Sequence, residues 1–499
     1  MRLHAVHRLA FCAPAITLLL AGCGTGTLPS ASSRAASGTP AAFANIDGGS
    51  VDFTRTKHRA PRSGVRRLLD VGGSLPSYTM TILWDVIVTG TNDHMSSPTM
   101  HERNGFSSQG QTWYLPANQL SGTSPFYREV DSNDHMDSTV TNEAGYYRTE
   151  AALGYVFPVG SVPGTAQIVR ENDPALGDHA TPSAYDLLSG YTQEPMNGAG
   201  FARYDNQLTS FTTLTANGIT AQTNAVAGGA FWTWTWNGKQ LIDNHDFGRL
   251  LQSSLFYGSN PVQNPTEAGD IAIGNAQDFH GSPNISTSVS GTVISTRTMP
   301  LEFVPQDFGA SVDSATGTPQ QAVLYKDVVI GKDVDLNFRN LPGIASYSTI
   351  FTLPNALSNV TTEIPTGYMP GTYNQFWIYD AGSQRLQSAP PPQCNTGAPA
   401  RVPSSQYPSF SGYGGVIISN LDQSVAMGVY ARTTAVGGPV SSFAMFDLTN
   451  NCPSINSAKW VANYSGSMPA GTTRVTTFVL TGTLSSVTAN MNLLKTMGY

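Results

Sequence analysis

The densest polar run in the sequence follows a Trp-rich segment and holds the residues best suited to acid–base chemistry. Within nine residues the chain places two amides, an imidazole, a carboxylate and a guanidinium: Asn244, His245, Asp246, Arg249 and Gln252. An imidazole beside a carboxylate is a candidate general acid or base. A guanidinium can hold a sugar hydroxyl or a carboxylate by a forked contact. We therefore predict catalytic roles for His245, Asp246 and Arg249, and substrate contacts from Asn244 and Gln252.

Two later polar loops supply further carboxylates. Glu267 lies in the segment 264–270, and Glu363 precedes Tyr368 by five residues. Either glutamate is a candidate second proton-transfer group, because a pair of carboxylates suits glycoside hydrolysis. We place Glu267 in the catalytic set and Glu363 among the substrate-binding residues. Tyr368 and Tyr430 are expected to stack on sugar rings.

A structural alternative exists for the same polar run. Asp246 and Arg249 would then form a buried ion pair that fixes a strand crossing, with His245 hydrogen-bonded beside it, because buried charges need partners. The two alternatives differ in whether Glu267 or Glu363 lies within reach of His245 in an open cleft. A buried, ion-paired His245 would argue against an enzyme.

A second candidate site comes from an Asp-His dipeptide that occurs three times, 41 and then 44 residues apart. The three copies are Asp93-His94, Asp134-His135 and Asp178-His179. Each copy is followed by a Gly-aromatic pair, which ends in Phe106, Tyr146 and Tyr191 respectively. This period predicts repeated units that bury their apolar faces against one another.

The Asp-His copies admit two interpretations. In the first, each carboxylate and imidazole binds sugar hydroxyls, with Tyr146, Tyr191 or Phe106 as a stacking platform. In the second, each Asp caps its own turn and each His packs. A three-His metal site is disfavoured, because turn residues face outward from the end of a barrel, and we predict no metal.

The elements that must position these residues are β-strands throughout. Residues 68–205 contain short β-prone segments separated by Gly, Pro and Asn turns, and three units of this size predict a β-trefoil-like module. Residues 206–499 contain longer segments with period-two alternation and hardly any amphipathic helix, which predicts a large antiparallel β-sandwich. Asn237-Gly238 is a hairpin signal directly before the polar run.

The N-terminal residues predict an export signal with a lipid anchor. Residues 1–23 combine a basic start, a short apolar run and the sequence Leu20-Ala21-Gly22-Cys23, and they resemble a bacterial lipoprotein signal in which Cys23 is lipidated. Residues 24–67 form a flexible linker that ends in a basic cluster between Arg55 and Arg67. That cluster is either a contact for anionic headgroups or a solvated linker end.

Composition agrees with export to an oxidising compartment. Only 12% of the residues are charged, while Gly and Pro are abundant, as in exported all-β proteins. After removal of the signal and lipidation of Cys23, Cys394 and Cys452 remain as a candidate disulfide. The net charge of −7 provides no field to recruit nucleic acid. We expect a cell-envelope protein, exposed outside the cytoplasm.

Both regions resemble known protein groups. The strands Phe126-Tyr127-Arg128-Glu129 and Ile168-Val169-Arg170-Glu171, with the Asp-His turns, resemble tandem lectin-like repeats of secreted bacterial proteins. The first copy departs from that pattern, because Leu83-Trp84-Asp85 stands where the Arg strand should be. The C-terminal run from Trp236 to Gln252, with Asn264–Gly269, is similar to the galactose-mutarotase-like β-supersandwich group, which implies sugar chemistry.

We therefore expect an all-β, lipid-anchored protein that binds a polysaccharide. If it is an enzyme, it cleaves the polysaccharide as a glycoside hydrolase or polysaccharide lyase, and we predict no cofactor. The alternative is a non-catalytic lipoprotein for glycan binding or adhesion. A purely structural role in the envelope would be favoured if neither region had an aromatic-lined concavity.

Overall fold

The structure is a computed structural model of the chain. It describes residues 75–99, 106–132, 134–145, 147–184, 188–202, 211–245, 247–258, 262–269, 281–308, 321–380, 383–389, 394–395, 398–399, 413–434, 437–448 and 456–499. The predicted export signal, Cys23 and the basic cluster lie outside these residues, as do Asp246, Tyr146 and Cys452. The predictions that rest on them therefore stay predictions.

The described chain is all-β, as predicted, with large antiparallel sheets and one α-helix. Among the described residues, no helix is both long enough and apolar enough to cross a membrane. Short 3-10 turns are η1 (Glu143–Gly145), η2 (Ala225–Ala227), η3 (Phe247–Arg249), η4 (Pro305–Phe308) and η5 (Phe338–Asn340).

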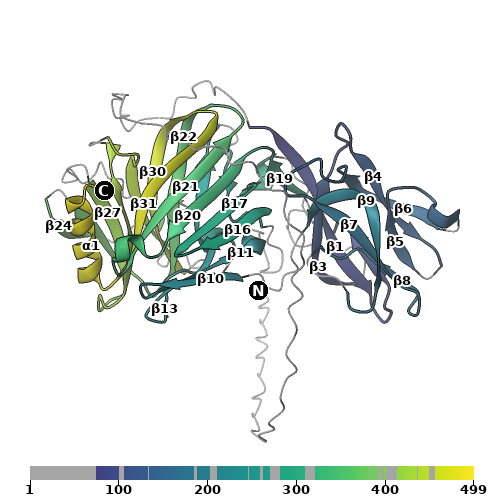
Figure 1. Ribbon diagram of the computed structural model, residues 1–499, viewed down its shortest axis with the longest axis horizontal. Helices are drawn as coiled ribbons and strands as arrows, with labels where there is room; N and C mark the ends of the chain where they lie inside the picture. The colour runs from purple at the N-terminus through teal and green to yellow at the C-terminus, as the bar shows by residue number, and fades with distance from the viewer. Residues whose placement is uncertain are drawn as a thin grey trace, which may run out of the picture. The chain divides into compact units, whose positions relative to one another are not determined.

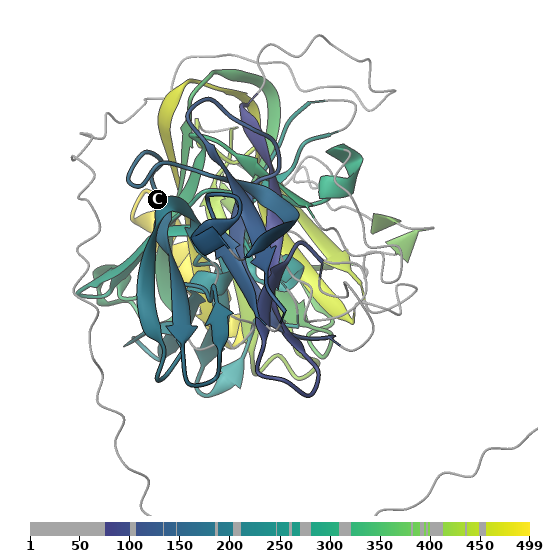
Figure 2. The same cartoon turned by 90° about the vertical axis from the view of Figure 1, so that its right-hand side faces the viewer.

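The three Asp-His copies belong to three repeats of three strands each, which we call the repeat module (residues 75–202). Figure 2 shows these strands facing the viewer, coloured from purple to teal. Their bounds are β1 (Ser77–Val88), β2 (His94–Ser97), β3 (Phe106–Pro116), β4 (Ser124–Val130), β5 (His135–Ser138), β6 (Arg148–Val156), β7 (Ala166–Asp173), β8 (Asp178–Ala180) and β9 (Thr192–Ala202).

Each repeat has the same pairing. Its long first strand pairs with the short second strand, which begins at or next to the Asp-His turn, and with the long third strand. The registers make equivalent positions explicit, because His94, His135 and His179 lie opposite Ile87, Val130 and Asn172. The predicted three-repeat organisation is thus confirmed, whereas a trefoil barrel is not established by these strands.

Equivalent apolar residues of the three repeats meet in one core. Leu83, Phe126 and Ile168 occupy the same position in β1, β4 and β7, and all three are fully buried in one cluster with Trp113 and Leu115. No repeat could bury this face alone, so burial of these side chains in a shared cluster is what joins the repeats.

A large β-sandwich is formed by the rest of the described chain. Its first sheet has nine strands, and Figure 1 labels several of them. In sheet order they are β16 (Asn284–Ser290), β17 (Val293–Thr298), β20 (Val329–Asp335), β21 (Ile344–Leu353), β31 (Gly471–Gly482), β28 (Ala426–Arg432), β27 (Tyr413–Ser419), β23 (Gln375–Asp380) and β24 (Arg385–Ala389).

The second sheet packs its inner face on the first. Its strands, each paired with the next, are β10 (Phe211–Ala216), β11 (Ile219–Asn224), β12 (Phe231–Trp236), β14 (Leu251–Phe256), β22 (Leu357–Pro370), β30 (Ser457–Met468) and β29 (Ser442–Asp447). Phe231, Ile364 and Trp460 of this sheet share one buried cluster with Tyr347 and Val429 of the first. The predicted antiparallel sandwich is confirmed.

Short strands complete the sandwich. They are β13 (Lys239–Gln240), β15 (Pro265–Thr266), β18 (Leu301–Glu302), β19 (Gln321–Tyr325), β25 (Cys394–Asn395) and β26 (Ala398–Pro399). The predicted hairpin at Asn237-Gly238 joins β12 to β13, and both turn residues have the positive φ that this turn requires.

The helix α1 (Leu484–Thr496) covers the outer face of the nine-stranded sheet, beside β27 in Figure 1. Thr483 caps it by accepting a hydrogen bond from the Ser486 amide. Its buried Leu484, Val487 and Met491 pack on Tyr430 and Phe478. Tyr430, predicted to stack on a sugar, is instead fully buried under this helix.

Strand β1 forms hydrogen bonds both within its own repeat and with a short strand of the sandwich. Its first half, Ser77–Thr81, pairs with β19, while the residues from Met80 to Val88 pair with β3. The predicted domain boundary near residue 206 falls within the segment 203–210, which lies outside the described residues, and stays a prediction.

Candidate functional site at the repeat junctions

The three Asp-His turns of the repeat module are linked to one another by hydrogen bonds that form a closed ring, and we call each of these contacts a clasp. The Asp93 carboxylate accepts the His135 backbone amide at 3.0 Å, and the Asp134 carboxylate accepts the His179 amide at 2.9 Å. The ring closes where the Asp178 carboxylate accepts the His94 amide at 2.8 Å. Each repeat is thus fastened to the next by its aspartate, and we call the three contacts junctions 1/2, 2/3 and 3/1.

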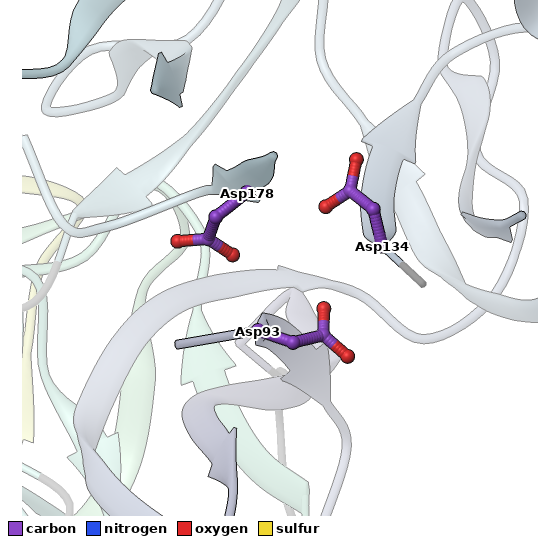
Figure 3. A group of neighbouring side chains, drawn as sticks. All are labelled: Asp93, Asp134 and Asp178. Atoms are coloured by element: carbon purple, nitrogen blue, oxygen red, sulfur yellow. The ribbon is translucent and has the colours of Figure 1, made fainter. Parts of the chain in front are cut away.

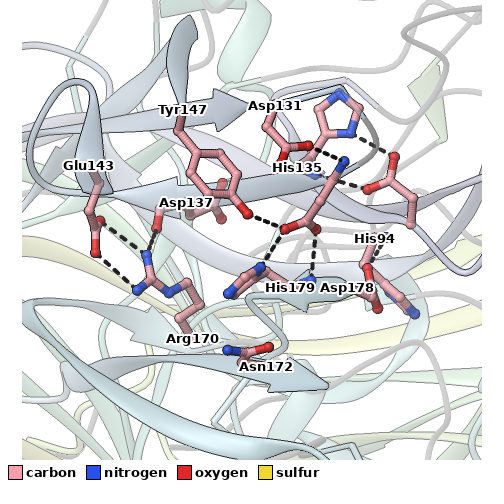
Figure 4. A network of polar contacts seen from close by, with 12 residues as sticks. His94, Asp131, His135, Asp137, Glu143, Tyr147, Arg170, Asn172, Asp178 and His179 are labelled. Carbon is pink, nitrogen blue, oxygen red and sulfur yellow. Dashed lines mark hydrogen bonds and ion pairs between the residues drawn. The ribbon is translucent and has the colours of Figure 1, made fainter. Parts of the chain in front are cut away.

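At junctions 1/2 and 2/3 the histidine side chain also binds the aspartate of the preceding repeat. The His135 Nδ1 lies 2.8 Å from Asp93 Oδ2, and the His179 Nδ1 lies 2.5 Å from Asp134 Oδ2 (Figure 4). Because an ionised carboxylate only accepts, each Nδ1 carries the proton, and a neutral ring presents its Nε2 as an acceptor. The expectation that each Asp caps its own turn was wrong: the capped backbone belongs to the next repeat.

Tyrosines brace two of the three aspartates from within their own repeat. The Tyr147 hydroxyl donates to Asp134 Oδ2 at 2.5 Å, and the Tyr191 hydroxyl donates to Asp178 Oδ2. Both tyrosines stand thirteen residues after their aspartate, where the first repeat has Phe106, which has no hydroxyl. The equivalent of Tyr191 is therefore Tyr147 and not the predicted Tyr146, and these rings act as braces for the clasp.

The three carboxylates converge, with one oxygen of each within 4.8 Å of the others (Figure 3). Oxygen atoms at this spacing could share a hard cation. However, all six carboxylate oxygens already accept a hydrogen bond from a backbone amide, an imidazole or a phenol. These donors compensate the negative charges, so the cluster is complete as a structural element.

The local environment moves two of these carboxyl pKa values in opposite directions. For Asp134, burial acts to raise the pKa, but the hydrogen bonds from His179 and Tyr147 prevail and lower it. For Asp178, burial dominates over the hydrogen bond from Tyr191 and raises the pKa, with a further contribution from the nearby negative charge of Asp134. The aspartate with both imidazole and phenol donors is thus the one most strongly held as an anion.

A second polar layer lies next to this cluster. Asp137 stands at the position of Ser96 in the first repeat, and the Ser96 hydroxyl donates to its carboxylate at 2.5 Å. Burial raises the Asp137 pKa to about 6, although Ser96, Thr181, Arg128 and Arg170 act to lower it. Asp137 is therefore a buried acid whose protonation changes within the range of ordinary experiments.

Arginines of the second and third repeats reach back to the repeat before them. Arg128 Nη1 donates to the Ser96 carbonyl at 2.9 Å, and Arg170 Nη1 donates to the Asp137 carbonyl at 3.0 Å. Their Nε atoms donate to Glu150 and Glu194, at 2.8 and 2.7 Å. Arg170 also contacts Glu143 (Figure 4). These arginines, which the sequence analysis left out of the site, fasten junctions 1/2 and 2/3 a second time.

Junction 3/1 differs because the first repeat has lost its arginine. Asp85 occupies the position of Arg128, and it draws the His94 Nδ1 to 3.0 Å from its carboxylate oxygens. The His94 ring therefore points to its own repeat and not to Asp178. Burial acts to lower the His94 pKa, but Asp85, Asp178 and Asp93 prevail and raise it. Because the first repeat has Asp85 in place of the arginine, its His94 ring binds within its own repeat.

The polar run of the sandwich is not assembled into a catalytic set. His245 is exposed, and no ion pair or hydrogen bond to Glu267 or Glu363 is found for it among the described residues. Arg249 faces Asp243 at 3.6 Å. The Gln252 side chain is buried, where its amide donates to the carbonyls of η3 and its oxygen accepts the Ala268 amide at 3.0 Å. Asn244 is half-buried beside His245.

Glu267 lies in the core of the sandwich, which corrects its predicted catalytic role. Its carboxylate is fully buried, forms an ion pair with the equally buried Lys332 and accepts the Ser253 amide at 3.0 Å. Lys332 Nζ also donates to the Gly229 carbonyl at 2.7 Å. A group sealed between two sheets cannot exchange protons with a polysaccharide, so this pair links the sheets.

Glu363 and Tyr368 meet on the outer face of the second sheet around a lysine. Lys459 Nζ lies 2.7 Å from Glu363 Oε1 and 4.8 Å from the centre of the Tyr368 ring. The Phe446 ring approaches the same ammonium at 5.4 Å. Burial acts to lower the Lys459 pKa, but Glu363 and Tyr368 prevail and raise it. Glu363 is thus committed to a charge pair with Lys459.

The comparisons with known proteins give only distant matches. No known family model and no curated protein matches the sequence. Among solved structures, a galactose mutarotase-like protein from Clostridium acetobutylicum is similar with a TM-score of 0.29 and 7% identity, over 55% of this chain and 95% of that one. A 4-alpha-glucanotransferase from Thermococcus litoralis has a TM-score of 0.26 and 7% identity, over 55% of this chain and 37% of that one.

The galactose-mutarotase-like group expected from the sequence is thus represented among these structures. At such TM-scores and identities, the likeness carries no argument about activity. The function has to be inferred from the contacts of this chain's own residues.

The three aspartates are expected to contribute unequally to stability. Asp134 satisfies three donors from two repeats, whereas Asp93 satisfies two, both on His135. Asp134→Ala should lower the free energy of unfolding by about 2–4 kcal/mol and Asp93→Ala by about 1–3 kcal/mol, because buried donors are left unpaired. Chemical denaturation at neutral pH measures both. Equal losses for the two variants would contradict the clasp as described.

Asp137 should make stability depend on pH in a defined direction. Its raised pKa means that the folded protein binds the proton more tightly, so the buried charge costs stability above pH 6, and this cost vanishes below the ordinary carboxyl pKa. Asp137→Asn should therefore be more stable than the parent at about pH 8, by roughly 3 kcal/mol, and the difference should fall to zero near pH 4. A difference that stays constant across this range, measured by urea denaturation, would sink the idea.

Proposed function

We propose that the protein is a non-catalytic polysaccharide-binding protein that holds sugar at junctions 1/2 and 2/3. The observation that carries this proposal is the clasped imidazole, which occurs at both of these junctions. His135 and His179 have their Nδ1 fixed by the aspartate of the preceding repeat, and each ring remains 15% exposed. A ring that is fixed in orientation and partly open to solvent is the kind of group that recognises a sugar hydroxyl.

Each junction combines this ring with groups that suit sugar recognition. At junction 1/2 the Glu150 carboxylate lies 3.5 Å from the His135 Nε2. At junction 2/3 the buried Tyr147 ring packs edge-on against His179, with ring centres 6.2 Å apart, and holds it in place, while Glu194 and Glu143 are about one-third exposed. Fixed polar groups bind hydroxyl-rich ligands with little ordering cost.

Binding is favoured over cleavage because the predicted acid–base groups of the sandwich are otherwise engaged. Glu267 is sealed in the core with Lys332, and Glu363 is paired with Lys459. Glycoside hydrolysis needs two carboxyl groups that flank the scissile bond in a solvent-accessible cleft. Neither glutamate meets this requirement in the described chain, so the enzymatic alternative has no observation in its favour.

The binding proposal predicts two sugar sites per chain. His135→Ala and His179→Ala should each weaken one of the two sites roughly 10–100-fold, which corresponds to the loss of a hydrogen bond in that site, and the double variant should weaken both. Calorimetric titration of the full chain with the best ligand from a glycan array measures stoichiometry and affinity together.

Two variants serve as controls for this experiment. His94→Ala removes the equivalent ring at the degenerate junction, and His245→Ala removes the exposed ring of the sandwich; both should leave the sugar sites intact. Loss of binding in His245→Ala with retention in the double variant would transfer the site to the sandwich and refute the proposal.

We also propose that the protein is exported and held at a membrane by lipid on Cys23, which is supported by the lipoprotein-like sequence of residues 1–23. Cys23→Ala should move the full chain from the membrane fraction to the soluble fraction of cells. Detergent phase partitioning measures this directly. A Cys23→Ala protein that stays in the detergent phase would exclude the lipid as the anchor.

A further inference from the structure

The repeat module is strongly acidic, and this charge bears on the kind of sugar it can hold. Residues 75–202 contain 14 Asp and Glu against four Arg and no Lys, a net charge of −10, whereas the whole chain carries −7. We infer that the junction sites take a polysaccharide with free amino groups, such as a de-N-acetylated hexosamine polymer. This inference rests on the proposed function and names its substrate class.

The cations of the two junctions are already used inside the module. Arg128 is only 3% exposed and is shared between Glu150 and the Ser96 carbonyl. Arg170 is 12% exposed and is shared between Glu143, Glu194 and the Asp137 carbonyl. The carboxylate of a uronic acid would therefore meet guanidinium groups whose donors are engaged, next to glutamates that repel it.

The partly exposed groups at junction 1/2 include a carboxylate that can accept further hydrogen bonds. His135 Nδ1 donates to Asp93, and its Nε2 lies 3.5 Å from Glu150 Oε2, which also accepts from Arg128 Nε at 2.8 Å. An ionised carboxylate has lone pairs for several donors. An ammonium group supplies three donors and a positive charge, and it therefore matches this carboxylate better than a hydroxyl group does.

The partly exposed glutamates extend this acceptor character to junction 2/3. Glu143 and Glu194 flank Arg170, and their two carboxylates outnumber its single charge. Arg148, at the start of β6, is exposed, and it is the remaining cation among the described residues of the module. An excess of negative charge over a whole module also concentrates cationic ligands near its surface and makes their binding dependent on salt.

The experiment compares four sets of oligosaccharides on the full chain by titration at low and at high salt. The probes are glucosamine oligomers, the same oligomers after N-acetylation, neutral glucose oligomers and oligogalacturonate. Glucosamine oligomers should bind at least about tenfold more tightly than their N-acetylated forms at low salt, and this preference should shrink at high salt. Polylysine of matched charge is the control for unspecific adsorption.

Charge-neutral variants locate the effect. Glu150→Gln with Glu194→Gln keeps an acceptor for each arginine and should reduce the preference for amino sugars over their N-acetylated forms about tenfold or more. The matched control is Asp327→Asn with Asp422→Asn, which removes the same number of charges at exposed turns of the sandwich. This control should retain the preference.

The possible outcomes separate this inference from the proposed function. Equal binding of the amino, N-acetylated and neutral oligomers, or preference for oligogalacturonate, overturns the inference and leaves glycan binding standing. Polylysine binding as tight as that of glucosamine oligomers reduces the effect to general charge attraction and also overturns it. Absence of binding to every sugar, here and on a glycan array, overturns both. The inference is supported if the preference for amino sugars is lost in the Glu150→Gln/Glu194→Gln variant and kept in the Asp327→Asn/Asp422→Asn control.

Discussion

The repeat module depends on one interaction used three times, the hydrogen bond from a histidine backbone amide to the aspartate of the preceding repeat. This contact orients each turn, and it brings three carboxylates to within 4.8 Å of one another. The charges are tolerated only because each oxygen receives a donor, and the apolar layer of Leu83, Phe126 and Ile168 is enclosed by the same ring of repeats. Loss of the donors to any one carboxylate would leave that charge uncompensated beside the other two.

The closed arrangement of the three repeats also explains why the junctions differ in what they can bind. A clasped imidazole is available where the arginine is retained, because Arg128 and Arg170 occupy the space that Asp85 takes in the first repeat. Where Asp85 replaces the arginine, it captures the His94 ring. The difference between Asp85 and the arginines at the same position therefore accounts for both the missing fastening contact and the inward-turned His94 ring at junction 3/1.

The sequence was sufficient to predict the all-β class, the three repeats, the sandwich and the Asn237-Gly238 hairpin, because each depends on local pattern or on a period. It also identified the first repeat as different. The partner of each aspartate could not be predicted from the sequence, because an Asp that caps a backbone amide 42 or 45 residues away gives the same sequence pattern as one that caps its own turn. The burial of Glu267 was equally hidden, because Lys332 lies 65 residues further along the chain. The true equivalent of Tyr191 was concealed because the residue that directly follows a Gly in the second repeat is Tyr146, one position before Tyr147.

Strand β1 has a mechanical consequence. The described chain enters at Leu75 and runs directly into β1, which is held on one side by β19 and on the other by β3. Tension applied to the chain ahead of Leu75 would act along the strand and load several ladder hydrogen bonds in shear at the same time, which resists rupture far better than unzipping them one by one. The first strand of the fold is thus built to carry a pull from its N-terminal side.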